Sequence, residues 1–172
     1  MNNILKINLA LLISVCGLSV LLNGCGGYSS ESLYPDDVTT VYVEMFDSRS
    51  FRRGVEYELT NAIAKRIETN TQYKVVSSRD RADTILSGQI ENIEQSVLTS
   101  ERQTGRAIEK DIELKAVVSW KNLKTGKLLL DNMSVNSRAS FSEWQSQGFD
   151  YGATLAANIL AERIVELMEK QW

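Results

Sequence analysis

The sequence predicts an α/β domain, more closely an α+β two-layer sandwich, with two helices on one face of a mixed four- to five-stranded sheet. Two segments, residues 52–69 and 151–170, repeat apolar residues at the helical spacing and have one apolar stripe each. Five shorter segments have the composition or alternation of strands. Because each helix has a single stripe, both must cover the same sheet face.

The first predicted strand is residues 38–46, and a polar turn at residues 47–50 follows it. Residues 52–69 then form the first helix, and residues 73–77 a short second strand. Strand, helix and strand in this order predict a right-handed crossover between two parallel strands. The alternation of the first strand predicts one face with Val41, Val43 and Met45, and another with Tyr42, Glu44 and Phe46.

Three more strands are predicted to form a meander, at residues 84–97, 112–120 and 128–141. The alternation of the first of them changes phase between Ile90 and Ile93, which predicts a β-bulge. The inward side chains of the last strand are predicted to be Met133, Val135, Ala139 and Phe141.

The second helix, residues 151–170, has a wide apolar face that includes Leu160 and Ile164. Asp150 precedes it and is the predicted N-cap, since a carboxylate can accept hydrogen bonds from the first free N–H groups.

A lipobox is the clearest motif of the chain. An apolar run leads to Val20-Leu21-Leu22-Asn23-Gly24-Cys25, in which a small residue precedes a cysteine. We interpret residues 1–24 as a cleaved signal peptide, with an N-acyl and S-diacylglycerol lipid attached to Cys25. The alternative is an uncleaved anchor helix, but the apolar run is shorter than the roughly 20 residues that such a helix needs. Residues 25–37 are then a tether, and residues 38–172 the domain.

The composition bounds the chemistry of the mature domain. The chain has two cysteines, Cys16 in the signal peptide and Cys25 at the lipid, and no histidine. The domain therefore lacks the usual neutral-pH base and the commonest metal ligands. A net charge of −3 gives no support for nucleic-acid binding. No catalytic motif is present, so we expect neither an enzyme nor a bound cofactor or metal.

One face of the predicted sheet is unusually polar. The last strand would carry Asn132, Ser134, Asn136, Arg138 and Ser140 on it. Such a face is either solvated or packed against a polar surface of a partner.

Several segments together resemble a known family. The lipobox leads to Cys25-Gly26-Gly27-Tyr28, and the first strand contains Thr40-Val41-Tyr42-Val43. The next segment is Phe46-Asp47-Ser48-Arg49-Ser50-Phe51-Arg52-Arg53-Gly54-Val55-Glu56-Tyr57-Glu58-Leu59-Thr60. Further on lie Tyr73-Lys74-Val75-Val76 and Ala82-Asp83-Thr84-Ile85-Leu86-Ser87-Gly88. In this order they resemble the lipopolysaccharide-assembly lipoprotein family, LptE.

The resemblance implies a lipid-anchored protein at the periplasmic leaflet of the outer membrane of a Gram-negative envelope. Members plug an LptD-type β-barrel translocon, help it assemble, and bind lipopolysaccharide. The alternative from the residues alone is a periplasm-facing outer-membrane lipoprotein that activates a cell-wall synthase or has a structural envelope role.

Candidate lipopolysaccharide contacts follow from charge and from the resemblance. The family implies a basic contact in the first hairpin loop of the meander, where residues 100–109 include Arg102 and Arg106. Residues 142–149, predicted at the same end of the sheet, contain no basic residue, and Arg138 could replace a contact there. The alternative is that the loop is charged for solubility.

Candidate partner contacts are Arg52, Arg53 and Trp144, together with Asn132, Ser134 and Asn136 of the polar face. Arg52 and Arg53 lie where positive charge opposes the dipole of the first helix, which suggests a partner. The alternative is a set of salt bridges to Asp47, Glu56 or Glu58. Trp144 lies in a polar loop, where it either anchors an interface or caps the core, whereas Trp120 is expected in the core.

Overall fold

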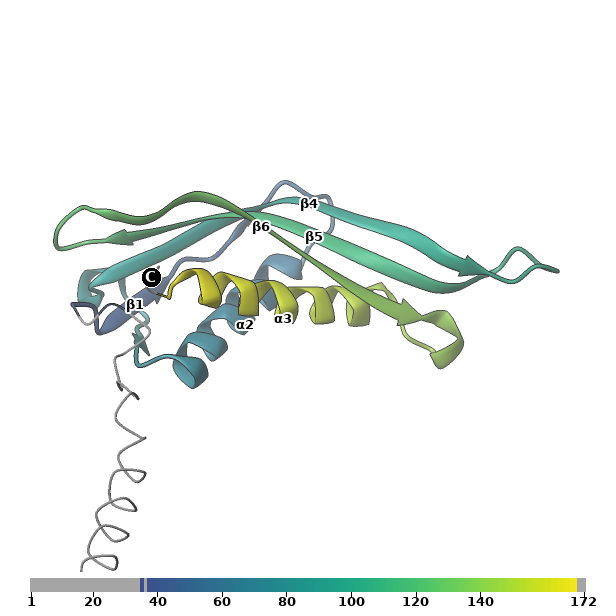
Figure 1. Ribbon diagram of the computed structural model, residues 1–172, viewed down its shortest axis with the longest axis horizontal. Coiled ribbons are helices and arrows are strands. Elements are labelled where there is room, and N and C mark those ends of the chain that lie inside the picture. Colours follow the sequence, from purple (N-terminus) through teal and green to yellow (C-terminus); the bar gives the residue numbers. More distant parts are fainter. Residues whose placement is uncertain (1–34, 36, 170–172) are drawn as a thin grey trace, which may run out of the picture. The chain divides into compact units, whose positions relative to one another are not determined.

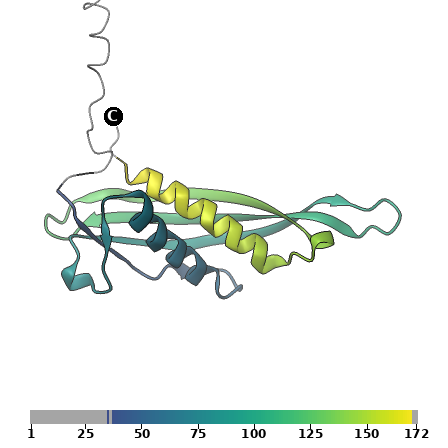
Figure 2. The same cartoon turned by 90° about the horizontal axis from the view of Figure 1, so that it is seen from below.

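The computed structural model describes residue 35 and residues 37–169, so the predicted signal peptide and Cys25 lie outside the described residues. The elements are, in order, β1 (Thr40–Val43), β2 (Asp47–Ser48), α2 (Val55–Asn70), β3 (Lys74–Val75), η1 (Arg79–Arg81), β4 (Thr84–Ser100), β5 (Ala107–Asn122), β6 (Leu128–Ser142), η2 (Glu143–Gln145) and α3 (Phe149–Leu167). Figures 1 and 2 show α2 and α3 on the same face of one sheet. This confirms the predicted two-layer α+β sandwich.

The sheet has the order β3-β1-β4-β5-β6, and β2 adds a short pairing to β4. β1 is parallel to both β3 and β4, whereas β4, β5 and β6 form an antiparallel meander. The predicted crossover of two parallel strands through a helix is therefore confirmed. The sheet has one strand more than predicted, because the expected turn at residues 47–50 contains β2, which pairs with Gln89 and Ile90.

The first strand is shorter than predicted, and its faces change after Val43. Phe46 is buried and Met45 is 47% exposed, so their predicted assignment to faces is wrong. The physical reason is a tertiary contact, since the Phe46 N–H donates to the Thr60 hydroxyl on α2 at 3.1 Å. The Phe46 ring then fills the space beside Gly88, where a Cβ atom would overlap it.

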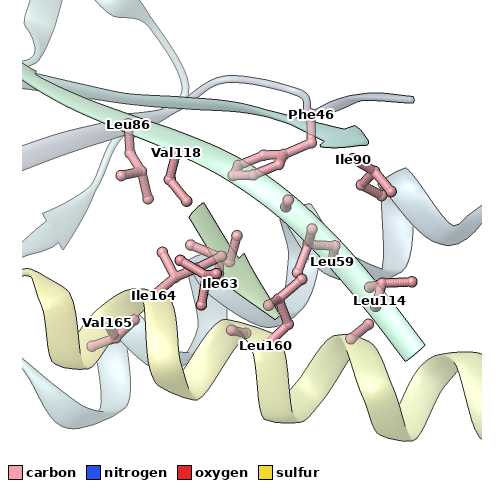
Figure 3. Close-up of a cluster of buried hydrophobic side chains, with 14 of the residues drawn as sticks. Phe46, Leu59, Ile63, Leu86, Ile90, Leu114, Val118, Leu160, Ile164 and Val165 are labelled. Carbon is pink, nitrogen blue, oxygen red and sulfur yellow. The ribbon is translucent and has the colours of Figure 1, made fainter. Parts of the chain in front are cut away.

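The core lies between the sheet and the two helices, as Figure 3 shows. Leu59 and Ile63 of α2 and Leu160 and Ile164 of α3 are fully buried. They pack against inward side chains of the sheet, which include Leu86, Ile90, Leu114 and Val118. Trp120 is buried in this core, as predicted.

Both helices begin at other residues than predicted. α2 starts at Val55 after Gly54, whose φ of 102° is a left-handed conformation that suits glycine. α3 starts at Phe149 after Gly148, so the prediction of Asp150 as the N-cap is wrong. Asp150 lies instead in the first turn, where its charge still complements the helix dipole.

Bulges set the path of the long strands. The predicted bulge of β4 is confirmed by the register shift between Ile90 and Asn92. The β5–β6 pairing also shifts register between Val118 and Trp120, next to Asn132 of β6, which has a positive φ of 46°. Beyond it, three of the predicted inward residues are buried, namely Val135, Ala139 and Phe141. Met133 is 39% exposed, so its predicted burial is wrong; it lies next to the bulge on the edge strand of the sheet.

The β4–β5 hairpin is longer than predicted, because β5 begins at Ala107 rather than at residue 112. Its tip extends beyond the ends of both helices in Figures 1 and 2. The helices therefore leave Val97 and Leu98 uncovered, with exposed fractions of 56% and 51%.

Candidate functional site

The tip of the β4–β5 hairpin presents two arginines. The Glu101 N–H donates to the Arg106 carbonyl and the Gly105 N–H to the Glu101 carbonyl, both at 2.8 Å, so the turn is closed by its own backbone. Arg102 and Arg106 are exposed, and neither forms an ion pair with any described residue. Two unpaired guanidinium groups on one turn can bind phosphate oxygens by charge-assisted, bidentate hydrogen bonds.

The end of β6 lies beside this hairpin, as predicted. Glu109 is opposite Ser142 in the register, and Lys110 pairs with Glu143. The turn at residues 121–127 lies at the other end of β5, where the Asn122 N–H donates to the Lys127 carbonyl. Residues 142–149 therefore share the end of the sheet with Arg102 and Arg106.

Arg138 has a different environment from these two arginines. Its Nε lies 3.3 Å from Asp111 Oδ2, and its Nη2 donates to Glu113. The hydrogen bond from the Arg138 guanidinium lowers the pKa of Glu113, and the same bond raises the pKa of Arg138. Asp111 is buried and also accepts a hydrogen bond from the Ser96 hydroxyl. The positive charge of Arg138 thus compensates two carboxylates of the neighbouring strand, and the register places it opposite Glu113, away from the hairpin tip.

The sheet face that carries Arg138 is exposed and polar. Asn132, Ser134 and Asn136 are all exposed on it. A groove with a volume of about 630 Å³ lies on this side, next to β2 and β4. Its lining includes Glu44, Asp47, Arg49, Gln89, Ser119 and Asn132. Carboxylates, amides and hydroxyls in this mixture suit a polar protein or saccharide surface better than an apolar ligand.

Arg52 and Arg53 precede α2 in the loop after β2. The Arg52 guanidinium lies 3.9 Å from the centroid of the Phe149 ring, a cation–π contact that joins this loop to the start of α3. Neither arginine forms an ion pair within the described residues, so the alternative of salt bridges to Asp47, Glu56 or Glu58 is wrong. Their role as partner contacts stays a prediction.

Two exposed aromatic residues lie in the segments that precede α2 and α3. Trp144 is 66% exposed, so most of its side chain lies outside the core. Phe51 is completely exposed, although the sequence pattern did not predict it as a contact residue. The sequence feature that indicates an exposed aromatic here is a single apolar residue among the polar residues Ser50, Arg52 and Arg53, next to a predicted helix.

Residue 35 and residues 37–169 contain no group of three or more acidic, cysteine or histidine side chains that could hold an ion. In the same residues, no helix has the length and hydropathy of a membrane-crossing segment.

Solved structures with a similar fold include two small proteins of low sequence identity. One is the uncharacterized lipoprotein B from Nitrosomonas europaea, with a TM-score of 0.53 and 14% identity over 82% of this chain and 88% of that one. Another is the hypothetical protein CT253 from Chlamydia trachomatis, with a TM-score of 0.52 and 11% identity over 74% of this chain and 93% of that one. At this identity both show the fold alone. Comparison with curated protein sequences gives no match.

The family assignment comes from the sequence model of a whole domain. The model described as "LptE: Lipopolysaccharide-assembly" matches residues 38–170, which is most of the chain. The match begins just before β1 and extends past α3, so it includes every strand and helix described above. This chain belongs to the LptE lipopolysaccharide-assembly family.

Proposed function

We propose that the protein is an outer-membrane lipoprotein, anchored through Cys25, that assembles with an LptD-type β-barrel and binds lipopolysaccharide. The observation that carries the proposal is the family match over residues 38–170. Family members are envelope lipoproteins and not catalysts, which supports the expectation that this protein is not an enzyme.

The lipopolysaccharide contact is proposed at the hairpin tip. Its phosphates are anionic, and Arg102 and Arg106 are the exposed, unpaired cations of that turn. Arg138, a third candidate from the sequence, is a weaker one because Asp111 and Glu113 already compensate its charge. Val97 and Leu98, exposed just before the turn, add apolar contact area that acyl chains could cover.

The barrel contact is proposed on the polar sheet face and near the start of α3. The groove beside Asn132 and the exposed Ser134 and Asn136 offer hydrogen-bonding groups to a polar wall. Arg52, Arg53 and Trp144 would add charged and aromatic anchors of the kind that are enriched at interfaces.

The test is copurification of tagged, lipidated protein from detergent-solubilised membranes, with the partners identified by mass. A large β-barrel in near-stoichiometric amount is the expected result. A cell-wall synthase in its place would favour the alternative of a synthase-activating lipoprotein. Recovery of the protein without either partner would contradict the proposed assembly.

A further inference from the structure

β6 forms one edge of the sheet, and it is a long edge. It has 15 residues and pairs only with β5, whereas β3 at the opposite end has two residues. From Met133 to Ser142 its register to β5 is unbroken. An edge of this length presents a row of backbone N–H and C=O groups that another strand can bind.

The hydrogen bonds around β6 show which residues direct these groups away from β5. The Asn136 carbonyl accepts a hydrogen bond from Arg163 Nη1 on α3. The Ser142 N–H donates to Gln147 Oε1 at 2.8 Å, and the Ser142 carbonyl accepts from the Gln147 N–H at 3.2 Å. Since backbone groups alternate in direction along a strand, the residues of the same parity, Ser134, Arg138 and Ser140, also point to the open edge.

The outward backbone groups of Ser134, Arg138 and Ser140 have no partner among the described residues, whereas the Asn136 carbonyl is bound by Arg163 and the backbone groups of Ser142 by Gln147. The regular part of this edge ends at the bulge near Asn132 toward the start of β6 and at the contacts of Gln147 with Ser142 at its end. Between them, residues 133–142 contain no proline and no lysine, the residues with which proteins commonly protect an edge. The one charged side chain, Arg138, is held over the sheet face by Asp111 and Glu113 and leaves the edge open.

α3 provides an apolar surface beside this edge. Arg163 reaches the Asn136 carbonyl, so the side of α3 that carries Arg163 faces the edge. Ile159 and Leu155 lie four and eight residues earlier in the helix, hence on the same side, and both are only partly buried. A strand added to β6 would direct alternate side chains toward Leu155 and Ile159, and the others toward the polar face.

The charge of Arg163 indicates the kind of strand that fits. None of the described carboxylates pairs with it, and its contact in this region is a backbone carbonyl. An acidic residue in the added strand would complete an ion pair there. A second copy of β6 would instead bring the two Arg163 side chains toward each other across a two-fold axis, which like-charge repulsion disfavours.

We propose that residues 134–140 of β6, together with Leu155, Ile159 and Arg163 of α3, accept an extended strand of another polypeptide by β-strand addition. The added strand has apolar residues at alternate positions toward α3, small polar residues between them, and an acidic residue near Arg163. Main-chain hydrogen bonds supply the affinity, and the flank of α3 supplies the selectivity. This acceptor edge is separate from the hairpin tip and does not depend on lipopolysaccharide binding.

The first test uses the purified, lipidated protein in detergent and a fluorescent synthetic peptide. The peptide alternates threonine with valine, and one central valine is replaced by glutamate. Saturable binding is expected.

Ser140→Pro removes a backbone N–H at the open edge and leaves the hydrogen bonds to β5 intact, and edge strands tolerate proline at such a position. This variant should weaken peptide binding at least about tenfold. Ser140→Ala, which keeps the N–H, should bind like the original protein. Equal binding of both variants, or no saturable binding by the original protein, would overturn the proposal.

A second test leaves the fold of the protein untouched. Two N-methylated versions of the peptide are compared. In one, the methyl groups block the N–H groups along one edge of the extended strand. In the other, they block the N–H groups along the opposite edge. One of them should lose binding and the other retain it, because only one row of N–H groups faces β6. Arg163→Glu should weaken binding of the glutamate-containing peptide. The same variant should bind a peptide with lysine in place of that glutamate. Equal loss of binding by both methylated peptides would exclude an added peptide strand at this edge. A protein dimer that the peptide cannot dissociate would exclude it as well.

Discussion

Asp83 accepts two hydrogen bonds from Thr39, one from its N–H at 2.9 Å and one from its hydroxyl at 2.6 Å. The Thr40 N–H adds a third at 3.0 Å, and Lys124 pairs with the other carboxylate oxygen. One side chain therefore joins the start of β1, the start of β4 and the β5–β6 turn. The Lys124 ammonium and the Thr39 hydroxyl hold the pKa of the Asp83 carboxyl well below its usual range.

This arrangement predicts an acid dependence of stability. Because the folded pKa of Asp83 lies below the unfolded value of about 3.9, the carboxylate stabilises the fold above that pH. The stabilisation should be lost as the pH falls below about 4 toward the folded value. Asp83→Asn should lower the free energy of unfolding by about 1.5–3 kcal/mol at neutral pH and flatten this dependence. Urea unfolding from pH 7 to pH 3 measures both, and an unchanged slope in the variant would contradict the assignment.

Truncation of the core at Leu59 should be costly. Leu59 is fully buried between α2 and the sheet, so Leu59→Ala should destabilise the protein by about 2–5 kcal/mol through lost burial and a cavity. Tyr57→Ala, at a neighbouring position that is 58% exposed, is the control and should change stability by less than about 0.5 kcal/mol. Chemical denaturation of both variants checks this, and similar losses would mean that the buried face of α2 is wrongly placed.

Gly88 should tolerate no side chain. A Cβ atom there would overlap the Phe46 ring and the Val117 carbonyl, so Gly88→Ala should destabilise by about 1–3 kcal/mol. Gly148→Ala is the matched control, because its Cβ would meet no atom within 4 Å. The melting temperatures of the two variants are compared. A Gly88 variant as stable as the control would contradict the close approach of Phe46 to Gly88.

Charge reversal at the hairpin tip should weaken lipopolysaccharide binding. Arg102→Glu combined with Arg106→Glu removes two unpaired cations, and a loss of at least about tenfold is expected, since each charge-assisted hydrogen bond contributes about 1.5–3 kcal/mol. The melting temperature should not change, because neither side chain has an ion-pair partner among the described residues. Binding to immobilised lipopolysaccharide measures the effect.

The control for this prediction is the same charge change at the other end of β4. Arg79 and Arg81 are exposed in η1, directly before β4, so Arg79→Glu with Arg81→Glu matches the net charge of the tip variant. Equal losses in both double variants would indicate only a long-range effect of charge and would remove the tip from the binding site.

Lipid attachment should depend on Cys25 alone. Cys25→Ala should abolish incorporation of labelled palmitate and leave the precursor uncleaved, whereas Cys16→Ala should behave like the original protein. Gel mobility and membrane fractionation report the result. Normal labelling of the Cys25 variant would show that the lipobox interpretation is incorrect.

The sequence predicted the layers of the fold because they depend on local periodicity. The stripes that contain Leu59, Ile63, Leu160 and Ile164 identified both helices and the side that each buries. The phase change after Ile90 predicted the bulge of β4 for the same reason, since an inserted residue reverses the alternation of a strand. The meander placed the loop with Arg102 and Arg106 at one end of the sheet, whereas its role in binding was implied by the family resemblance.

The sequence did not reveal which polar residues are already paired, and only the tertiary structure decided this. Arg138 looked like a free cation until the register placed it beside Asp111 and Glu113. Phe46 turned inward because of a hydrogen bond to Thr60, on a different element.

The open edge of β6 and the contact of Arg163 with Asn136 also depend on the order of strands. The reason is general: the spacing of apolar residues fixes the geometry within one element, whereas pairing between elements depends on register and packing across long stretches of chain.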